Sequence, residues 1–202
     1  MTKKKLADDI DFLFEMGAIR FMDRSWVHFL REDFANVTEH HFRVFWLAMV
    51  IASHEKGVDT GKLAKMALVH DIAESRSSDV DYLSRQYVVR NEELSVHDMF
   101  AGTAVEKEFL ELWQEYEERE SLESKIVKDA DNLDVDFELA EQAAKGSRLQ
   151  ADKAPMRQTV AETKLYTETA KQMFEQLKGV NPHQWHLKTR NRINGGDWKT
   201  TS

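Results

Sequence analysis

Apolar side chains recur every three or four residues along most of this chain, which predicts helices rather than strands. The first such stretch covers residues 4–16, has three aspartates opposite its apolar side, and ends near Gly17. Residues 39–55 are apolar on nearly every side, as expected of a helix buried at the centre of a fold, with Thr38 as candidate N-cap. The next helix opens at Thr60 or Gly61 and ends in His70-Asp71.

The second half continues in the same way. Residues 91–119 are predicted to be helical with a possible break near Gly102, and Ser121 is the candidate N-cap of a long helix over residues 122–144. A last helix is expected over residues 161–177, ended by Gly179. The pattern therefore predicts an all-α fold with a single domain over residues 1–180 and an irregular C-terminal tail over residues 181–202.

Composition narrows the class of protein. Only two prolines and eight glycines interrupt the 202 residues. The 36 acidic and 28 basic residues give a net charge of −8, which argues against binding to a nucleic-acid polymer. The longest apolar run, residues 44–52, falls far short of the roughly 20 residues that span a membrane. Because the chain has no cysteine and no recognisable signal peptide, we expect a cytoplasmic protein without a membrane partner.

The most informative stretch is residues 65–74, where an apolar run ends in His70-Asp71 and a carboxylate follows at Glu74. On a continuous helix, His70 and Glu74 would share a face because they are four residues apart. Burying charged groups is costly unless they are paired or bound to a metal ion. The stretch therefore predicts either a metal site in the core or a set of buried ion pairs.

Two other helices offer further ligands. His40 and His41 lie in the first turn of the buried helix, and one of them is a candidate. Among four aspartates of the 122–144 helix, Asp131 falls between Val127 and Val135 at four-residue spacings and is expected to point inward. Two imidazoles and two carboxylates suit one divalent transition metal, such as Mn, Co, Fe, Ni or Zn.

Arginines and a tryptophan precede these helices. Arg20, Arg24 and Trp26 lie in a short segment that is either a connector with solvated arginines or a loop that faces a ligand. In the second interpretation, an arginine holds a phosphate with two hydrogen bonds and Trp26 packs against a base or sugar.

Taken in order, the candidates read His40, His70-Asp71 and Asp131. This arrangement resembles the H…HD…D signature of the HD-domain metal-dependent phosphohydrolases, over residues 13–144. Residues 37–44 are similar to the helix opening of that superfamily and favour His40 over His41. The resemblance implies an all-α HD-domain bundle that holds one metal ion through His40, His70, Asp71 and Asp131.

Within the superfamily, the chain is most similar to the 5′-deoxynucleotidases, which carry HD-x-x-E followed by a further aspartate. The resemblance implies that Glu74 and Asp79 act in catalysis by positioning or activating water and handling the sugar or leaving oxygen. It also implies substrate contacts from Arg24 or Arg20 to phosphate and from Trp26 to the nucleoside. The chain departs from the family by one residue inserted between Arg24 and Trp26, and by the lack of a glycine before Asp79.

The expected reaction is hydrolysis of a (deoxy)nucleoside 5′-monophosphate to nucleoside and phosphate through a metal-bound water. Two alternatives are an HD hydrolase of another phosphoester and a non-catalytic HD scaffold that binds a nucleotide or partner protein. A helical bundle with buried ion pairs and no metal is a further possibility. Relatives of this type are commonly dimers, so we expect a homodimer, with Phe109 and Trp113 as interface or core residues.

Overall fold

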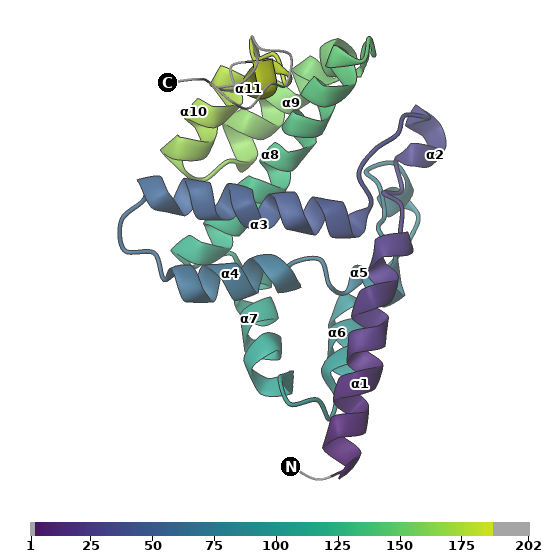
Figure 1. Cartoon of the computed structure of the whole chain (residues 1–202). Coiled ribbons are helices and arrows are strands. Elements are labelled where there is room, and N and C mark those ends of the chain that lie inside the picture. Colours follow the sequence, from purple (N-terminus) through teal and green to yellow (C-terminus); the bar gives the residue numbers. More distant parts are fainter. Residues whose placement is uncertain (1–2, 188–202) are drawn as a thin grey trace, which may run out of the picture.

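The computed structural model describes residues 3–187, and this part of the chain is helical apart from its loops and one isolated β-bridge between Asp23 and Asn36 (Figure 1). The all-α class is therefore confirmed. The elements in order are α1 (Lys3–Ala18), η1 (Ile19–Phe21), α2 (Val27–Leu30), α3 (Val37–His54), α4 (Thr60–Val69), α5 (Glu74–Ser77), η2 (Ser84–Gln86), α6 (Glu92–Phe100), α7 (Glu106–Glu118), α8 (Leu122–Ala144), α9 (Leu149–Lys164), α10 (Glu168–Leu177) and α11 (Gln184–Leu187).

Helices α3 and α8 cross at the centre of the fold (Figure 1). Helix α4 packs against both, α7 packs against α4 and α8, and α9 and α10 cover the far part of α8. These contacts remove the apolar sides of the central helices from water, which is the main favourable term in folding. Fully buried members of this core are Val44, Ile51, Leu63, Met66, Ile126 and Leu133.

Polar caps decide where the central helices begin. Helix α3 starts after Asn36, not after Thr38, because the Asn36 side chain accepts from the Glu39 N–H while Glu39 accepts from the Asn36 N–H. Helix α4 begins at Thr60 with Asp59 as its cap. Ser121 caps α8, and the predicted bounds of this helix are confirmed.

The C-terminal helices differ from the prediction. Residues 149–164 form α9, which the sequence pattern missed, and Pro155 lies inside it. The single helix predicted over residues 161–177 is wrong, since the chain leaves α9 at Leu165 and Thr167 caps a separate α10. The predicted break at Gly102 is confirmed between α6 and α7, where that residue has a φ of +80°. Of the tail predicted to be irregular over residues 181–202, residues 184–187 form the short helix α11, and residues 188–202 lie outside the described residues.

Helix α1 presents its apolar stripe to solvent. Leu13 and Phe14 are 64% and 77% exposed, and Leu6 and Ile10 are also exposed. The opposite side faces the protein, where Asp9 accepts a hydrogen bond from the Ala104 N–H at 2.6 Å. The amphipathic pattern therefore located the helix correctly but does not mark the side that packs on the domain.

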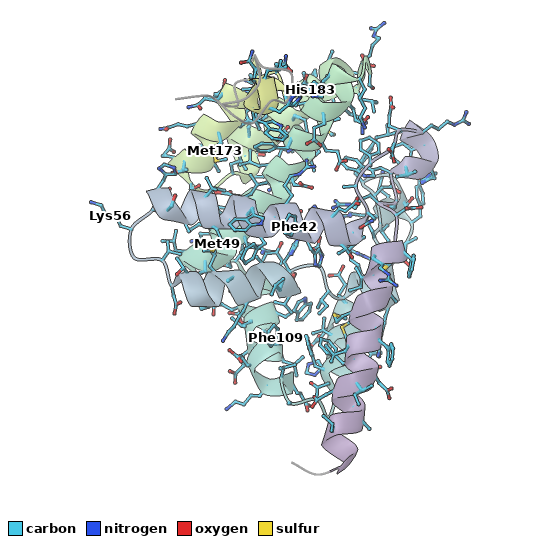
Figure 2. All side chains as sticks on the ribbon, in the orientation of Figure 1. Phe42, Met49, Lys56, Phe109, Met173 and His183 are labelled. Carbon is cyan, nitrogen blue, oxygen red and sulfur yellow. The ribbon has the colours of Figure 1, made fainter. Side chains whose placement is uncertain are left out.

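Helix α3 is less buried than its composition suggests. Phe42, Trp46 and Val50 are spaced four residues apart and are all exposed, and Figure 2 shows Phe42 on the outer side of the helix. Trp113 by contrast is buried in the core, and Phe109 packs against the core. In the described residues, no helix is both long and apolar enough to cross a membrane.

Candidate metal centre and pocket

Three central helices bring four potential ligands together. His40 lies in the first turn of α3, His70 and Asp71 follow the end of α4, and Asp131 lies in the middle of α8. One ligand atom from each of the four lies within 4.8 Å of the others. The Nε2 atom of His40 is 3.4 Å from Nε2 of His70, 3.5 Å from an Asp71 oxygen and 3.4 Å from an Asp131 oxygen.

The hydrogen bonds of the two imidazoles fit a metal ion. The Nδ1–H of His70 donates to the Ala67 carbonyl at 2.9 Å, and Nδ1–H of His40 donates to Asp134 at 2.7 Å. In a neutral imidazole the other nitrogen then carries a lone pair. Two lone pairs and two carboxylate oxygens therefore converge on one point. A divalent cation bound there would remove the repulsion between them.

The surroundings of the two imidazoles shift their pKa values in opposite directions. Burial and the charge of Arg24 lower the pKa of His40, but hydrogen bonds to Asp131, Asp134 and Asp71 outweigh them and raise it well above its usual value. Burial lowers the pKa of His70. Because imidazole and carboxylate ligands bind a metal ion in their deprotonated forms, protons compete with the ion for this cluster, and metal affinity falls as the pH is lowered.

His41 lies beside the cluster and is not one of the four converging residues. Its ring is 4.6 Å from the ring of His70, and its buried Nε2 finds no hydrogen-bond partner among the described residues. Burial and the charges of His70 and His40 lower its pKa well below the ordinary value. The geometry therefore favours His40 over His41.

Residues 70–74 do not continue helix α4. The Ile72 N–H bonds to the Val69 carbonyl and the Glu74 N–H bonds to the Asp71 carbonyl, a three-residue spacing that makes the turn tighter than an α-helix. The prediction that His70 and Glu74 share one helical face is therefore wrong. The tight turn instead hydrogen-bonds the backbone of Glu74 to that of Asp71.

The Glu74 carboxyl is buried next to the cluster, with a side chain 10% exposed. Its Oε2 atom finds no partner among the described residues, and its Oε1 atom is 3.6 Å from Arg90. Burial, reinforced by the charges of Asp71 and Asp79, raises the pKa of Glu74 to about 9. In the metal-free protein this carboxyl group is protonated at neutral pH and can donate a hydrogen bond.

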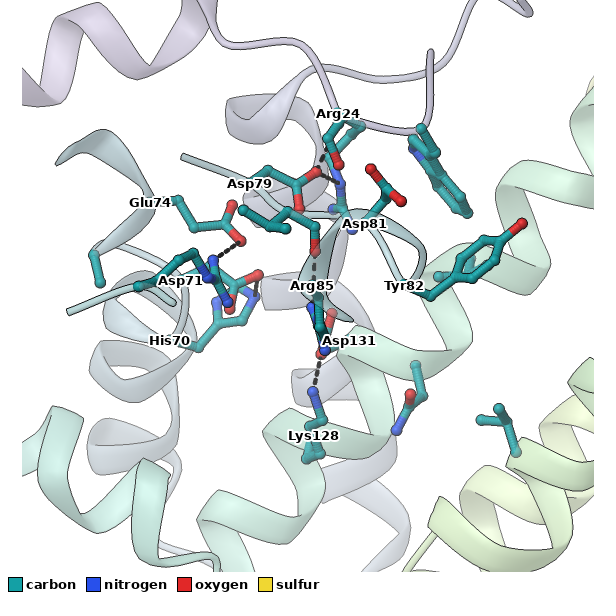
Figure 3. Close-up of a pocket in the computed structure, with 18 of the residues that line it drawn as sticks. Arg24, His70, Asp71, Glu74, Asp79, Asp81, Tyr82, Arg85, Lys128 and Asp131 are labelled. Atoms are coloured by element: carbon teal, nitrogen blue, oxygen red, sulfur yellow. Dashed lines mark hydrogen bonds and ion pairs between the residues drawn. The ribbon is translucent and has the colours of Figure 1, made fainter. Parts of the chain in front are cut away.

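A cavity of about 480 Å³ opens over these residues (Figure 3). Arg24, Trp26 and Asp79 line it together with Asp71. Asp79 accepts from Nε of Arg24 at 3.1 Å and from the Ser25 N–H at 2.9 Å, and so joins the two loops that form one wall. Trp26 stacks on Phe34 with a centroid distance of 5.0 Å, and its buried Nε1 has no partner among the described residues.

Arg20 does not belong to this pocket. Its side chain is exposed, and its guanidinium lies 4.7 Å from the centre of the Phe21 ring. The predicted substrate contact of Arg20 is therefore corrected, because η1 places this residue on the outer surface and away from the cavity lining. Arg24 is the arginine of this segment that reaches the cavity.

The aspartates of α8 are more buried than the sequence suggested. Asp129, Asp134 and Asp136 are 0%, 2% and 7% exposed, and Asp131 is less buried because it lines the cavity. Asp134 is a residue that the sequence analysis missed, and it orients the imidazole of His40. Its position three residues after Asp131, on the same side of the helix, was the available signal.

Comparisons with known proteins point to one family. A family model described as an HD domain matches residues 16–178. The 5'-deoxynucleotidase HDDC2 of Homo sapiens is 30% identical over 138 residues, which cover 65% of this chain and 67% of that protein. The protein of the same name from Dictyostelium discoideum is 29% identical over 143 residues, covering 64% of this chain and 75% of that one.

Solved structures share the fold at lower identity. A conserved hypothetical protein from Pyrococcus furiosus is similar with a TM-score of 0.71 at 23% identity, covering 85% of this chain and 99% of that one. A predicted metal-dependent phosphohydrolase from Magnetospirillum magnetotacticum has a TM-score of 0.65 at 22% identity, covering 87% and 92%.

Proposed function

Because the chain belongs to the HD-domain family, we propose that it is a metal-dependent phosphohydrolase that removes phosphate from deoxynucleoside 5′-monophosphates. One observation carries the proposal. The Nε2 atoms of His40 and His70 and oxygens of Asp71 and Asp131 converge at the base of a cavity that Arg24 and Trp26 also line, and Figure 3 shows part of this set.

His40, His70, Asp71 and Asp131 would hold the ion in this proposal. A divalent ion supplies polarisation of a phosphoryl oxygen and activation of water near neutral pH. The open side of the cluster faces the cavity, so substrate approaches from there. The ion is Mn, Co, Fe, Ni or Zn, all of which accept mixed imidazole and carboxylate ligands.

Glu74 and Asp79 take different roles. Glu74 lies buried beside the cavity with Oε2 free of a partner among the described residues, so its carboxyl group can position the attacking water or pass a proton to the leaving 5′ oxygen. Asp79 accepts from Nε of Arg24 and fixes the guanidinium at the mouth of the cluster. Arg24 then presents its remaining N–H groups to phosphate.

The rest of the cavity fits a nucleoside. Trp26 offers an indole N–H and Ser25 a hydroxyl, both buried without partners among the described residues. Val135, Met156 and Val160 add apolar lining to the same cavity. Sugar hydroxyls can meet the first pair of groups, and a base can pack against the second set.

We also propose that the protein is a homodimer. Leu6, Ile10, Leu13 and Phe14 form one exposed apolar stripe on α1, here called the α1 stripe. Contiguous apolar surface of this kind is typical of a protein interface. The interface is thus assigned to α1, and not to Phe109 and Trp113, which pack in or against the core.

Metal content and phosphate release test the function together. The purified protein should hold about one transition metal ion per chain and release phosphate from deoxynucleoside 5′-monophosphates when Mn, Co and Mg are added separately. Ribonucleotides serve as comparison substrates. Bound metal without monophosphate turnover would indicate that the substrate is another phosphoester. The absence of both metal and turnover would favour a non-catalytic scaffold.

Two variants separate metal binding from chemistry. His70→Ala should lose the bound metal, because one converging nitrogen is removed. Glu74→Gln should retain the metal but lower kcat by about 100-fold or more, the usual contribution of a general acid or base. A metal-loaded, active His70→Ala protein would contradict the site, and an unchanged kcat for Glu74→Gln would contradict its role in positioning water or transferring a proton.

A further inference from the structure

A second wall of the cavity carries hydrogen-bond donors to which the proposed mechanism gives no role. Tyr116 and Arg119 come from the end of α7, and Lys128 and Asn132 come from α8. In Figure 3, Lys128 and Arg24 lie at opposite ends of the labelled cluster, with the metal-site residues between them. The pocket thus has cations on both sides of the metal centre.

Several donors on this wall have no acceptor in the part of the chain that the structure describes. Tyr116 is 2% exposed, and its hydroxyl finds no hydrogen-bond partner among the described residues. Burial and the charges of Asp131 and Asp71 raise the pKa of Tyr116 well above its usual value, so the phenol remains a donor. Nη1 of Arg119 and Nδ2 of Asn132 are likewise buried without partners in the described part of the chain. Buried donors without an acceptor are costly, and an oxyanion that enters the cavity would satisfy them.

Arg119 is held in place but is weakly paired. Its guanidinium carbon lies 3.6 Å from the centre of the Tyr116 ring, so one face is stacked and the N–H edge stays available. Its carboxylate neighbour Glu117 is 3.9 Å away, whereas Arg24 has Asp79 at 3.1 Å. The positive charge of Arg119 is therefore less compensated than that of Arg24.

The backbone of Arg119 is also unusual. It ends α7 with φ 58° and ψ 28°, a left-handed conformation that is most often occupied by glycine at this position of a helix. Arg31 ends α2 with the same φ and ψ, but its side chain is exposed and does not line the cavity. The two arginines form a matched pair that differs in access to the pocket.

Charge balance indicates which ligand this wall would take. Two carboxylates, Asp71 and Asp131, balance the charge of one divalent ion, so a phosphate dianion needs cations of its own. Arg119 and Lys128 both line the cavity, on the side that α7 and α8 form. Lys128 also bonds to Asp131 at 2.6 Å, next to the metal position.

We infer that Arg119 and Lys128, with the Tyr116 hydroxyl, bind the phosphoryl oxygens that point away from Arg24, so that the phosphate is held from two sides. The inference rests on the proposed function and extends its phosphate contacts to α7 and α8. It makes Arg119 a phosphate-binding residue. The ligand class is a phosphomonoester or the inorganic phosphate released from it.

The test titrates inorganic phosphate into protein loaded with one equivalent of Mn²⁺, measured by calorimetry. Arg119→Gly suits the left-handed backbone, so the fold should be kept while phosphate affinity falls about tenfold or more, as expected for loss of a charged hydrogen bond. Arg31→Gly makes the same change at an exposed helix end and should bind phosphate like the wild type. Metal content should be equal in all three proteins.

Two further variants keep the test decisive. Arg119→Asn also tolerates the left-handed conformation and should lose affinity like Arg119→Gly, whereas Arg119→Lys should retain part of it. Wild-type phosphate affinity in Arg119→Gly and Arg119→Asn, or an equal loss in Arg31→Gly, would overturn the inference. The titration needs no turnover. Inactivity toward deoxynucleotides would therefore refute the proposed function, while the phosphate affinities of the variants would still test the role of Arg119.

Discussion

Asp134 shows how a single residue outside the ligand set shapes the site. Its carboxylate accepts from Nδ1 of His40 at 2.7 Å and is itself 3.4 Å from Nε of Arg43. This contact places the proton of His40 on Nδ1 and orients the ring so that Nε2 faces His70, Asp71 and Asp131. Residues that orient metal-binding histidines in this way commonly contribute 10- to 100-fold to metal affinity.

Replacing Asp134 with asparagine tests that role. The amide can still accept a hydrogen bond but lacks the negative charge, so we expect the affinity for Mn²⁺ or Co²⁺ to fall roughly 10- to 100-fold. Competition with a chelator measures the change. Glu141→Gln, which alters the outer partner of Arg43 at 2.9 Å, is the control and should have little effect. Equal affinities for Asp134→Asn and wild type would show that backbone packing alone orients His40.

At the scale of elements, α8 organises the domain through four aspartates with different partners. Asp131 faces the cavity, Asp134 binds His40, Asp136 forms two hydrogen bonds with Arg157, and Asp129 accepts three from the start of α10. Their side chains turn around the helix and so reach different neighbours. One helix thus fixes both the metal site and the attachment of the C-terminal helices.

Asp129→Ala should weaken the attachment of the C-terminal helices without changing the metal site. The substitution leaves the Tyr166 N–H and the Thr167 N–H and hydroxyl without their acceptor, which should lower the free energy of unfolding by roughly 3 kcal/mol. Urea denaturation measures the loss, and metal content should be unchanged in the folded protein. Asp152→Ala on exposed α9 surface is the control, expected within about 0.5 kcal/mol of wild type. A similar stability for both variants would contradict the capping role.

Helix prediction succeeded where local signals were strong. Helix α8 follows its cap at Ser121 and contains no glycine or proline, so its bounds could be read directly. Helix α9 was missed because Pro155 and a sparse apolar pattern obscure it, although Arg157 on this helix is buried against Asp136. A buried ion pair between distant segments leaves no periodic trace in the sequence.

At the scale of the whole molecule, the α1 stripe predicts self-association. Light scattering on the wild type should give twice the chain mass, and Leu13→Glu/Phe14→Glu should give a monomer, since both side chains are more than half exposed in the isolated chain. Trp185→Glu changes an exposed aromatic on α11 and should leave the dimer intact. A monomeric wild type, or a dimeric double variant, would remove α1 as the interface.

The sequence alone determined that the chain is helical, because helical period is a local property. Periodicity and ligand type indicated His70, Asp71 and Asp131 and left His40 and His41 open, and the resemblance to the HD superfamily favoured His40. The structure brings His40, His70, Asp71 and Asp131 within 4.8 Å of one another. Only the tertiary structure decided that the apolar stripe of α1 is exposed, that Arg20 lies outside the pocket, and that Asp134 and Arg119 lie next to the site. Periodicity states which side chains share a face, but the energy of burying that face depends on which distant element covers it.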